Sequence, residues 1–140
     1  MLTTTLLHPE ILRALGRAGH GSQVLIGDGN YPFSTGSPAT AEKVFLNLKP
    51  GMVKVTDVLE TLVVSIPIEM ATVMVPEDRA DQPIFREFRK LLPGQLNLTK
   101  IGRFDFYDRA RNSDTALVIA TGEQRIYANL LLTVGVRTPK

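Results

Sequence analysis

The sequence contains no cysteine among its 140 residues. This absence excludes disulfide bonds, thiolate nucleophiles and sulfur-ligated metal centres, although it does not distinguish a reducing from an oxidising compartment. Apolar runs long enough to span a membrane are also missing, and residues 1–5 lack the basic start and apolar centre of a secretory signal. We therefore expect a protein that lies outside the membrane, in the cytoplasm.

Neither sign of charge dominates the chain. Lys and Arg number 16 and Asp and Glu number 14, so the formal net charge is only +2 although the isoelectric point is near 9.1. The charges are interspersed and form no basic stretch, and no nucleic-acid partner is therefore expected. The length and a hydrophobic content of 44% suit one globular domain, predicted to span residues 1–140.

The spacing of apolar residues predicts helices that alternate with strands. Prolines at first helical positions open helices at Pro9 and Pro83, and the consecutive apolar residues 24–26 predict a strand buried on both faces. The predicted strands are 23–27, 44–48, 69–75, 96–101, 116–120 and 130–134, and the predicted helices are 9–19, 55–62, 83–92 and 103–111. This alternation predicts a single layered α/β/α domain with a central sheet of about six strands. The apolar strand 130–134 suits either the core or a subunit interface.

Only two histidines, His8 and His20, are available for imidazole chemistry near neutral pH. His8 is predicted to begin the first helix. His20 lies between two glycines just after that helix, where small neighbours leave its ring accessible. Taken alone, this segment still favours an exposed loop histidine over a functional one.

Asp28 is predicted to lie at the carboxyl end of the strand 23–27, where ligands of open α/β sheets bind. The local sequence leaves two interpretations open, because the same carboxylate is suited to a turn in which it bonds the backbone of Gly29 and Asn30. The following segment 29–40 is rich in Pro, Gly and hydroxyl residues, which predicts an ordered loop with a functional task.

Three residues in the last third of the chain offer groups suited to bind hydroxyls. Arg103 and Asn129 carry fixed donors and Tyr127 carries a phenol. Each of them, considered alone, favours a structural role in a surface ion pair or at a sheet edge.

Several common sites lack the residues that they need. The glycines beside His20 and Asp28 are not followed by the Lys-Ser or Lys-Thr of a phosphate loop and do not match the dinucleotide-binding pattern. No second histidine or carboxylate stands at a helical spacing that would complete a metal cage, and Gly122-Glu123 has no serine of a nucleophile elbow beside it. Neither a metal nor a cofactor is therefore expected.

Four short motifs occur in an order and at a spacing that are typical of one family. They are Gly19-His20-Gly21, Asp28-Gly29-Asn30-Tyr31-Pro32, Arg103-Phe104-Asp105-Phe106-Tyr107, and Thr121-Gly122-Glu123 followed by Tyr127-Ala128-Asn129. On these motifs the chain resembles the L-fucose mutarotase and D-ribose pyranase family from Pro9 to Val136. The resemblance implies a cofactor-independent isomerase that binds a monosaccharide.

The resemblance also implies roles for individual residues. His20 matches the family's proton donor, so that His20 and Asp28 become the expected catalytic pair. Asp28, Arg103 and the segment Tyr127, Ala128 and Asn129 match sugar-binding positions. Arg103 and the motif that begins at Asp28 look more like the fucose branch, whereas alanine at position 128 looks like the ribose branch.

Three functions remain open at this point. The first is anomer exchange of L-fucose or a related sugar, and the second is exchange between the pyranose and furanose forms of D-ribose. The third is a non-catalytic sugar-binding regulatory module. The resemblance further implies a homo-oligomer with sites near subunit boundaries, and a decameric ring is among the assemblies that fit.

Overall fold

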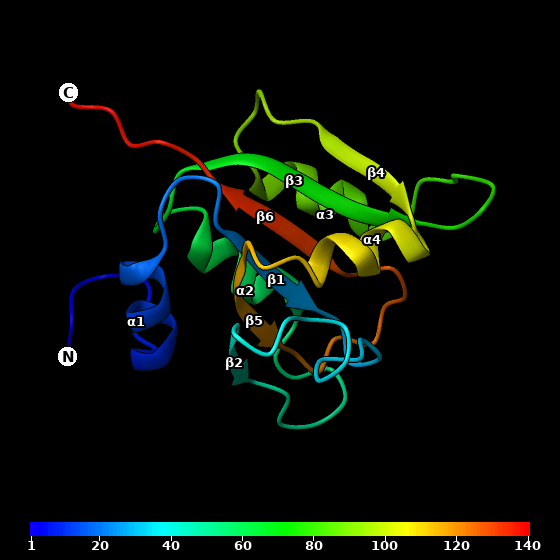
Figure 1. Ribbon diagram of the computed structural model, residues 1–140, viewed down its shortest axis with the longest axis horizontal. Helices are drawn as coiled ribbons and strands as arrows, with labels where there is room; N and C mark the ends of the chain where they lie inside the picture. Colours follow the sequence, from blue (N-terminus) through cyan, green and yellow to red (C-terminus); the bar gives the residue numbers. More distant parts are fainter.

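The computed structural model describes residues 1–140 and is built on one six-stranded sheet (Figure 1). The sheet order is β2-β5-β1-β6-β3-β4, in which β6 runs antiparallel to its neighbours and every other pair is parallel. The carboxyl ends of five strands and the amino end of β6 therefore share one edge of the sheet. The strands are β1 Gln23–Gly27, β2 Glu42–Phe45, β3 Ile68–Val75, β4 Leu98–Gly102, β5 Thr115–Ala120 and β6 Leu130–Val134.

Helices cover both faces of the sheet, which confirms the predicted α/β class. The residues of α1, α2 and α3 pack on one face in a core of 23 buried residues, whereas α4 and the loop after β1 cover the other face with a core of 8. Figure 1 shows α4 in front of the sheet, with α2 and α3 behind it. The helices are α1 Pro9–Arg17, α2 Val55–Leu62, α3 Pro83–Leu91 and α4 Arg103–Ala110.

The apolar runs in β1 and β6 follow from these two layers. Val24 and Ile26 belong to the larger core, and Leu25 between them belongs to the smaller one. A strand between two apolar layers needs an apolar residue at every position, not at every second one. In β6, which lies between β1 and β3, all residues but the half-buried Thr133 are likewise buried within the chain.

Two details of the local structure bear on the predictions. His8 begins α1 as expected, since its Nδ1 accepts a hydrogen bond from the backbone N–H of Ile11 at 3.4 Å. The second strand was predicted too late in the chain: β2 is Glu42–Phe45, and the chain folds back on itself through a turn in which the N–H of Met52 donates to the carbonyl of Lys49. Pro50-Gly51 lies within this turn and favours it. Leu48, which was predicted to end the strand, lies beside the turn and is exposed.

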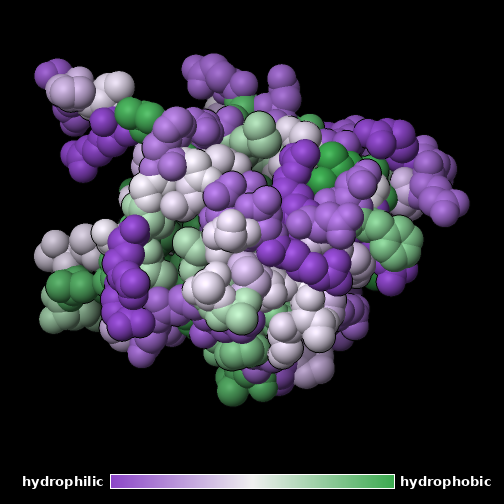
Figure 2. Space-filling model, viewed as in Figure 1, coloured by the Kyte–Doolittle hydropathy of each residue, from purple (hydrophilic) through white to green (hydrophobic).

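None of the four helices has the length and apolar character that crossing a bilayer requires. Hydrophilic residues predominate on the face seen in Figure 2, and the hydrophobic ones form small groups scattered among them.

Candidate active site

A cavity of about 370 Å³ lies at the edge of the sheet where β1, β3 and β4 end and β6 begins. Its size is within the range of about 300–1,000 Å³ that is usual for small-molecule sites. The residues around it come from four separate parts of the chain. They are Asp28, Asn30, Tyr31, Met74, Arg103, Tyr107, Ile126, Tyr127 and Asn129.

Asp28 follows β1 directly and is only 3% exposed. Burial is the main influence on its carboxyl group and raises the pKa above the ordinary value, and hydrogen bonds from the backbone, first that of Asn30, offset this effect in part. Its Oδ1 accepts from the N–H of Asn30 at 3.0 Å. Asp28 therefore forms the turn that the sequence allowed and also lines the cavity, so both interpretations of this residue hold together.

Asn129 faces Asp28 from the start of β6. Its Oδ1 accepts the backbone N–H of Asp28 at 2.8 Å, a contact between residues that are 101 positions apart. Because the amide oxygen is occupied in this way, the amide nitrogen is the atom left to donate to a ligand. Asn129 is buried, so its orientation is fixed before a ligand arrives.

A cation and two phenols complete the polar lining. Arg103 is the first residue of α4, and its guanidinium carbon lies 5.7 Å from the centre of the Tyr107 ring one helical turn later. Tyr127 adopts the left-handed conformation with φ of 56°, which non-glycine residues rarely adopt and which often marks a functional position. Arg103 is the only cation that lines the cavity.

Tyr31 belongs to the cavity wall as a structural residue. Its hydroxyl donates to the carbonyl of Gly36 at 2.6 Å, and its ring meets those of Phe106 and Tyr107 edge to face. Burial raises the pKa of this phenol well above its usual range, so Tyr31 stays protonated. The loop after β1 is thereby attached to α4 next to the ligand space.

His20 lies at the other end of β1 from Asp28. The five-residue strand β1 separates them, which corresponds to roughly 17 Å at the usual rise per residue. Its Nε2 is 3.0 Å from Oε2 of Glu69, close to the start of β3, and its side chain is 59% exposed. One chain therefore brings Asp28, Arg103, Tyr127 and Asn129 together but leaves His20 outside their cavity.

Ala128 also differs from the other expected sugar-binding residues. Its side chain is fully buried and does not line the cavity, while its backbone hydrogen bond favours the charged form of Asp28. No group of three or more His, Asp or Glu side chains comes together in a way that would hold a metal ion.

Five further residues line the cavity without having been assigned a role from the sequence, although Asn30, Tyr31 and Tyr107 belong to the quoted motifs. Asn30 and Tyr31 stand beside Asp28, and Tyr107 stands one helical turn after Arg103, so their neighbours could have indicated them. Met74 is the penultimate residue of a predicted strand, at the edge where ligands gather. Ile126 lies in an irregular segment that carries no such signal.

A comparison of the whole sequence with known families decides which family this is. The sequence model of the RbsD / FucU transport protein family matches residues 1–137. The chain belongs to this family. Asp28, Arg103 and Tyr127, which come from three of the motifs quoted above, all line the cavity.

Curated relatives in the RbsD / FucU family match nearly the whole chain. The fucose mutarotase of Bos taurus is 32% identical over 147 residues, which cover 96% of this chain and 92% of the relative. The fucose mutarotase of Homo sapiens is 33% identical over 144 residues, which cover 94% and 90%.

Solved structures of RbsD / FucU proteins share the fold. FucU from Bifidobacterium longum superposes with a TM-score of 0.79 at 31% identity, covering 94% of this chain and 95% of that one. Bacillus subtilis RbsD complexed with D-ribose superposes with a TM-score of 0.81 at 24% identity, covering 99% and 100%. The fucose mutarotase of Streptococcus pneumoniae in complex with L-fucose gives 0.80 at 24% identity, again covering 99% and 100%.

Proposed function

We propose that the chain is a cofactor-independent sugar isomerase that opens and recloses the ring of L-fucose or a related monosaccharide. The observation that carries the proposal is the meeting of Asp28, Arg103 and Asn129 around one cavity, in a chain about one-third identical to fucose mutarotases over nearly its full length. A buried carboxylate, a guanidinium and an oriented amide form a set that suits a small polyol.

The reaction needs two proton transfers. A base removes the proton of the anomeric hydroxyl while an acid protonates the ring oxygen, and the bond between the anomeric carbon and the ring oxygen breaks. The open-chain aldehyde rotates about the bond between its first and second carbons. The reverse proton transfers then close the ring as the hydroxyl attacks the other face of the aldehyde carbonyl. We assign the base to Asp28, because a raised pKa brings a carboxylate closer to the working pH.

His20 is the proposed acid. An imidazole has an unperturbed pKa near neutrality, and each well-placed proton transfer contributes about 10²- to 10⁴-fold. Because β1 separates His20 from Asp28 within one chain, the proposal requires that His20 enters the cavity of a second copy. Its exposed ring at the far end of the sheet is available for that contact. The proposed enzyme is therefore a homo-oligomer, and a closed ring satisfies every site when each subunit gives its histidine to the next.

The remaining residues of the cavity select the sugar. Arg103 and Asn129 donate to hydroxyls, and Tyr127 either bonds a hydroxyl or lies against the apolar side of the ring. An epimer that cannot pair with these groups leaves them unsatisfied once the bound sugar covers them, which costs affinity. Exchange of D-ribose between its pyranose and furanose forms uses the same open-chain intermediate and is the alternative substrate.

Magnetisation-transfer NMR tests the proposal. A trace of the protein is added to L-fucose, D-ribose or D-galactose at anomeric equilibrium, and saturation of one anomeric signal is followed to the others. We expect transfer to exceed the uncatalysed rate for at least one sugar, with Asp28→Asn as the inactive control. Binding without accelerated transfer would instead indicate a sugar-binding module and would overturn the proposed isomerase.

A further inference from the structure

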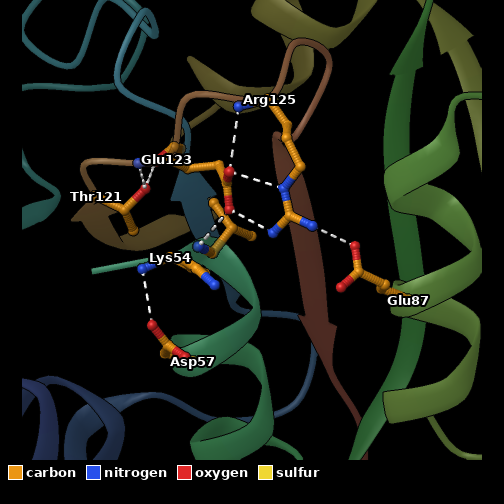
Figure 3. A network of polar contacts seen from close by, with 8 residues as sticks. Lys54, Asp57, Glu87, Thr121, Glu123 and Arg125 are labelled. Atoms are coloured by element: carbon orange, nitrogen blue, oxygen red, sulfur yellow. Dashed lines mark hydrogen bonds and ion pairs between the residues drawn. The ribbon is translucent and has the colours of Figure 1, made fainter. Parts of the chain in front are cut away.

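The segment that carries Tyr127 and Asn129 lies between β5 and β6 and has no helix or strand of its own. Asn129 is held by its hydrogen bond to Asp28 and by β6, which begins at the next residue, so other contacts must anchor the part of the segment that precedes Tyr127. Figure 3 shows a network of polar contacts that joins this segment to its surroundings. Its members are Glu123 and Arg125 from this segment and Glu87 from α3.

Glu123 is the centre of the network and is only 4% exposed. Its Oε2 accepts the backbone N–H of Val55 at 3.2 Å, and its Oε1 accepts the backbone N–H of Arg125 at 3.1 Å. Val55 is the first residue of α2, where helix N–H groups lack partners within the helix. The carboxylate thus ties the segment to the start of α2.

Arg125 connects this carboxylate to a second helix. Its Nε and Nη2 donate to the two oxygens of Glu123 at 2.9 and 2.8 Å, and its Nη1 pairs with Glu87. Burial alone would raise the pKa of Glu123, but the hydrogen bonds and charge of Arg125 outweigh it, and the pKa lies below its ordinary value. Glu123 therefore ties the segment to α2 and Arg125 ties it to α3, and the planar, two-point ion pair joins these two side chains within the segment.

The same segment also holds the loop of Asp28. The N–H of Gly29 donates to the carbonyl of Glu123 at 2.9 Å, and the hydroxyl of Thr121 donates to the carbonyl of Gly27 at 2.7 Å. A Cβ at Gly29 would lie 3.1 Å from that Glu123 carbonyl, so the two backbones are in close contact. These contacts therefore join the segment to the loop that carries Asp28.

We propose that Arg125 is a positioning residue, whose guanidinium between Glu123 and Glu87 holds Tyr127 and Asn129 in the place where they bind the sugar. This inference rests on the proposed function for its kinetic consequences. Arg125 does not line the cavity, so its influence acts only through the segment that it anchors.

The test compares Arg125→Met with Arg89→Met. Arg89 forms a two-point ion pair with Asp81 of the same chemistry, but neither residue belongs to the cavity or to the network. We expect Arg125→Met to lower kcat/KM for sugar exchange by about 10- to 100-fold, mainly through a higher KM, because a small misplacement of binding groups is costly and removes uniform binding. Arg89→Met should retain both constants.

A second readout does not depend on activity. The chain has three tyrosines, Tyr31, Tyr107 and Tyr127, and all of them line the cavity. Their ring ¹H–¹³C signals, assigned by single Tyr→Phe changes, report on the cavity walls. In Arg125→Met we expect the Tyr127 signals to shift or broaden, while those of Tyr31 stay because its hydroxyl is bonded to Gly36.

Arg125→Met leaves the buried carboxylate of Glu123 without its cation, which could prevent the variant from folding. Two further variants keep the inference testable in that case. Glu87→Gln removes only the outer contact and should raise KM by a smaller factor. The double variant Glu123→Gln/Arg125→Met removes both charges and should raise KM as Arg125→Met does. Wild-type KM and an unchanged Tyr127 ring in the folded variants would overturn the positioning role. A wild-type protein that exchanges no sugar would overturn the proposed function instead, and the Tyr127 signals would still decide the role of Arg125.

Discussion

The side chain of Asn129 accepts the backbone N–H of Asp28 at 2.8 Å and thereby joins the end of β1 to the start of β6. Neighbouring strands running in opposite directions bring these residues to the same edge of the sheet. One hydrogen bond thus fixes the backbone of the proposed base and the orientation of an amide donor beside it. Structure and proposed chemistry depend on the same contact.

Replacement of Asn129 separates these two effects. Asn129→Ala leaves the buried N–H of Asp28 without an acceptor, at a cost of about 1–3 kcal/mol, and also removes a sugar donor. Asn129→Asp keeps the acceptor but loses the amide donors and adds a negative charge. We expect calorimetry to show a lower Tm for the alanine variant and NMR to show slower exchange for both. Wild-type exchange in either variant would remove Asn129 from the site.

Asp28→Asn should stabilise the folded protein at neutral pH while it abolishes exchange. Burial raises the pKa of Asp28 above the ordinary value of 3.8. Between that value and the raised one the folded state binds more protons than the unfolded state, so stability falls as pH rises through this window. The variant avoids this loss, and its Tm should exceed that of the wild type at pH 7 and approach it below pH 3.8. A lower Tm at pH 7 would contradict the desolvation of Asp28.

Replacement of two tyrosines should affect two different properties, stability in one case and KM in the other. Tyr31→Phe removes a buried hydrogen bond to Gly36, so we expect a loss of about 0.5–1.5 kcal/mol of stability. Tyr127 lines the cavity, and Tyr127→Phe removes its hydroxyl, so we expect a KM up to about ten times higher, from one lost hydrogen bond of the same strength, at unchanged Tm. Thermal unfolding and exchange NMR measure both. A Tyr127→Phe variant with a wild-type KM would restrict Tyr127 to ring contacts.

Much of the fold could be predicted because the local patterns agree with the tertiary structure. Pro9 and Pro83 do open helices, and the runs at 24–26 and 130–134 do form strands with apolar layers on both faces. The end of β2 was misplaced because the turn at Pro50-Gly51 draws the preceding residues away from the sheet. The spacing of apolar residues in the sequence does not indicate the backbone contacts of such a turn.

The site was less predictable than the fold. Asp28 could be assigned to the site because its position at the carboxyl end of a strand can be recognised from the neighbouring residues. The roles of Glu123 and Arg125 depend instead on contacts with α2 and α3, which no local sequence pattern contains. The separation of His20 from Asp28, in contrast, was already implied by the strand predicted between them. The roles of these residues, the cytoplasmic location and the oligomeric state stay predictions.

The most direct test of a catalytic cavity shared between subunits mixes two inactive variants. His20→Ala lacks the proposed acid and Asp28→Asn lacks the proposed base, and the two chains are co-expressed in equal amounts. If each site combines Asp28 of one chain with His20 of another, random assembly makes about one quarter of the sites complete. We predict that sugar exchange returns to about one quarter of the wild-type rate. No recovery from properly assembled mixtures, or wild-type exchange in His20→Ala alone, would contradict the shared site.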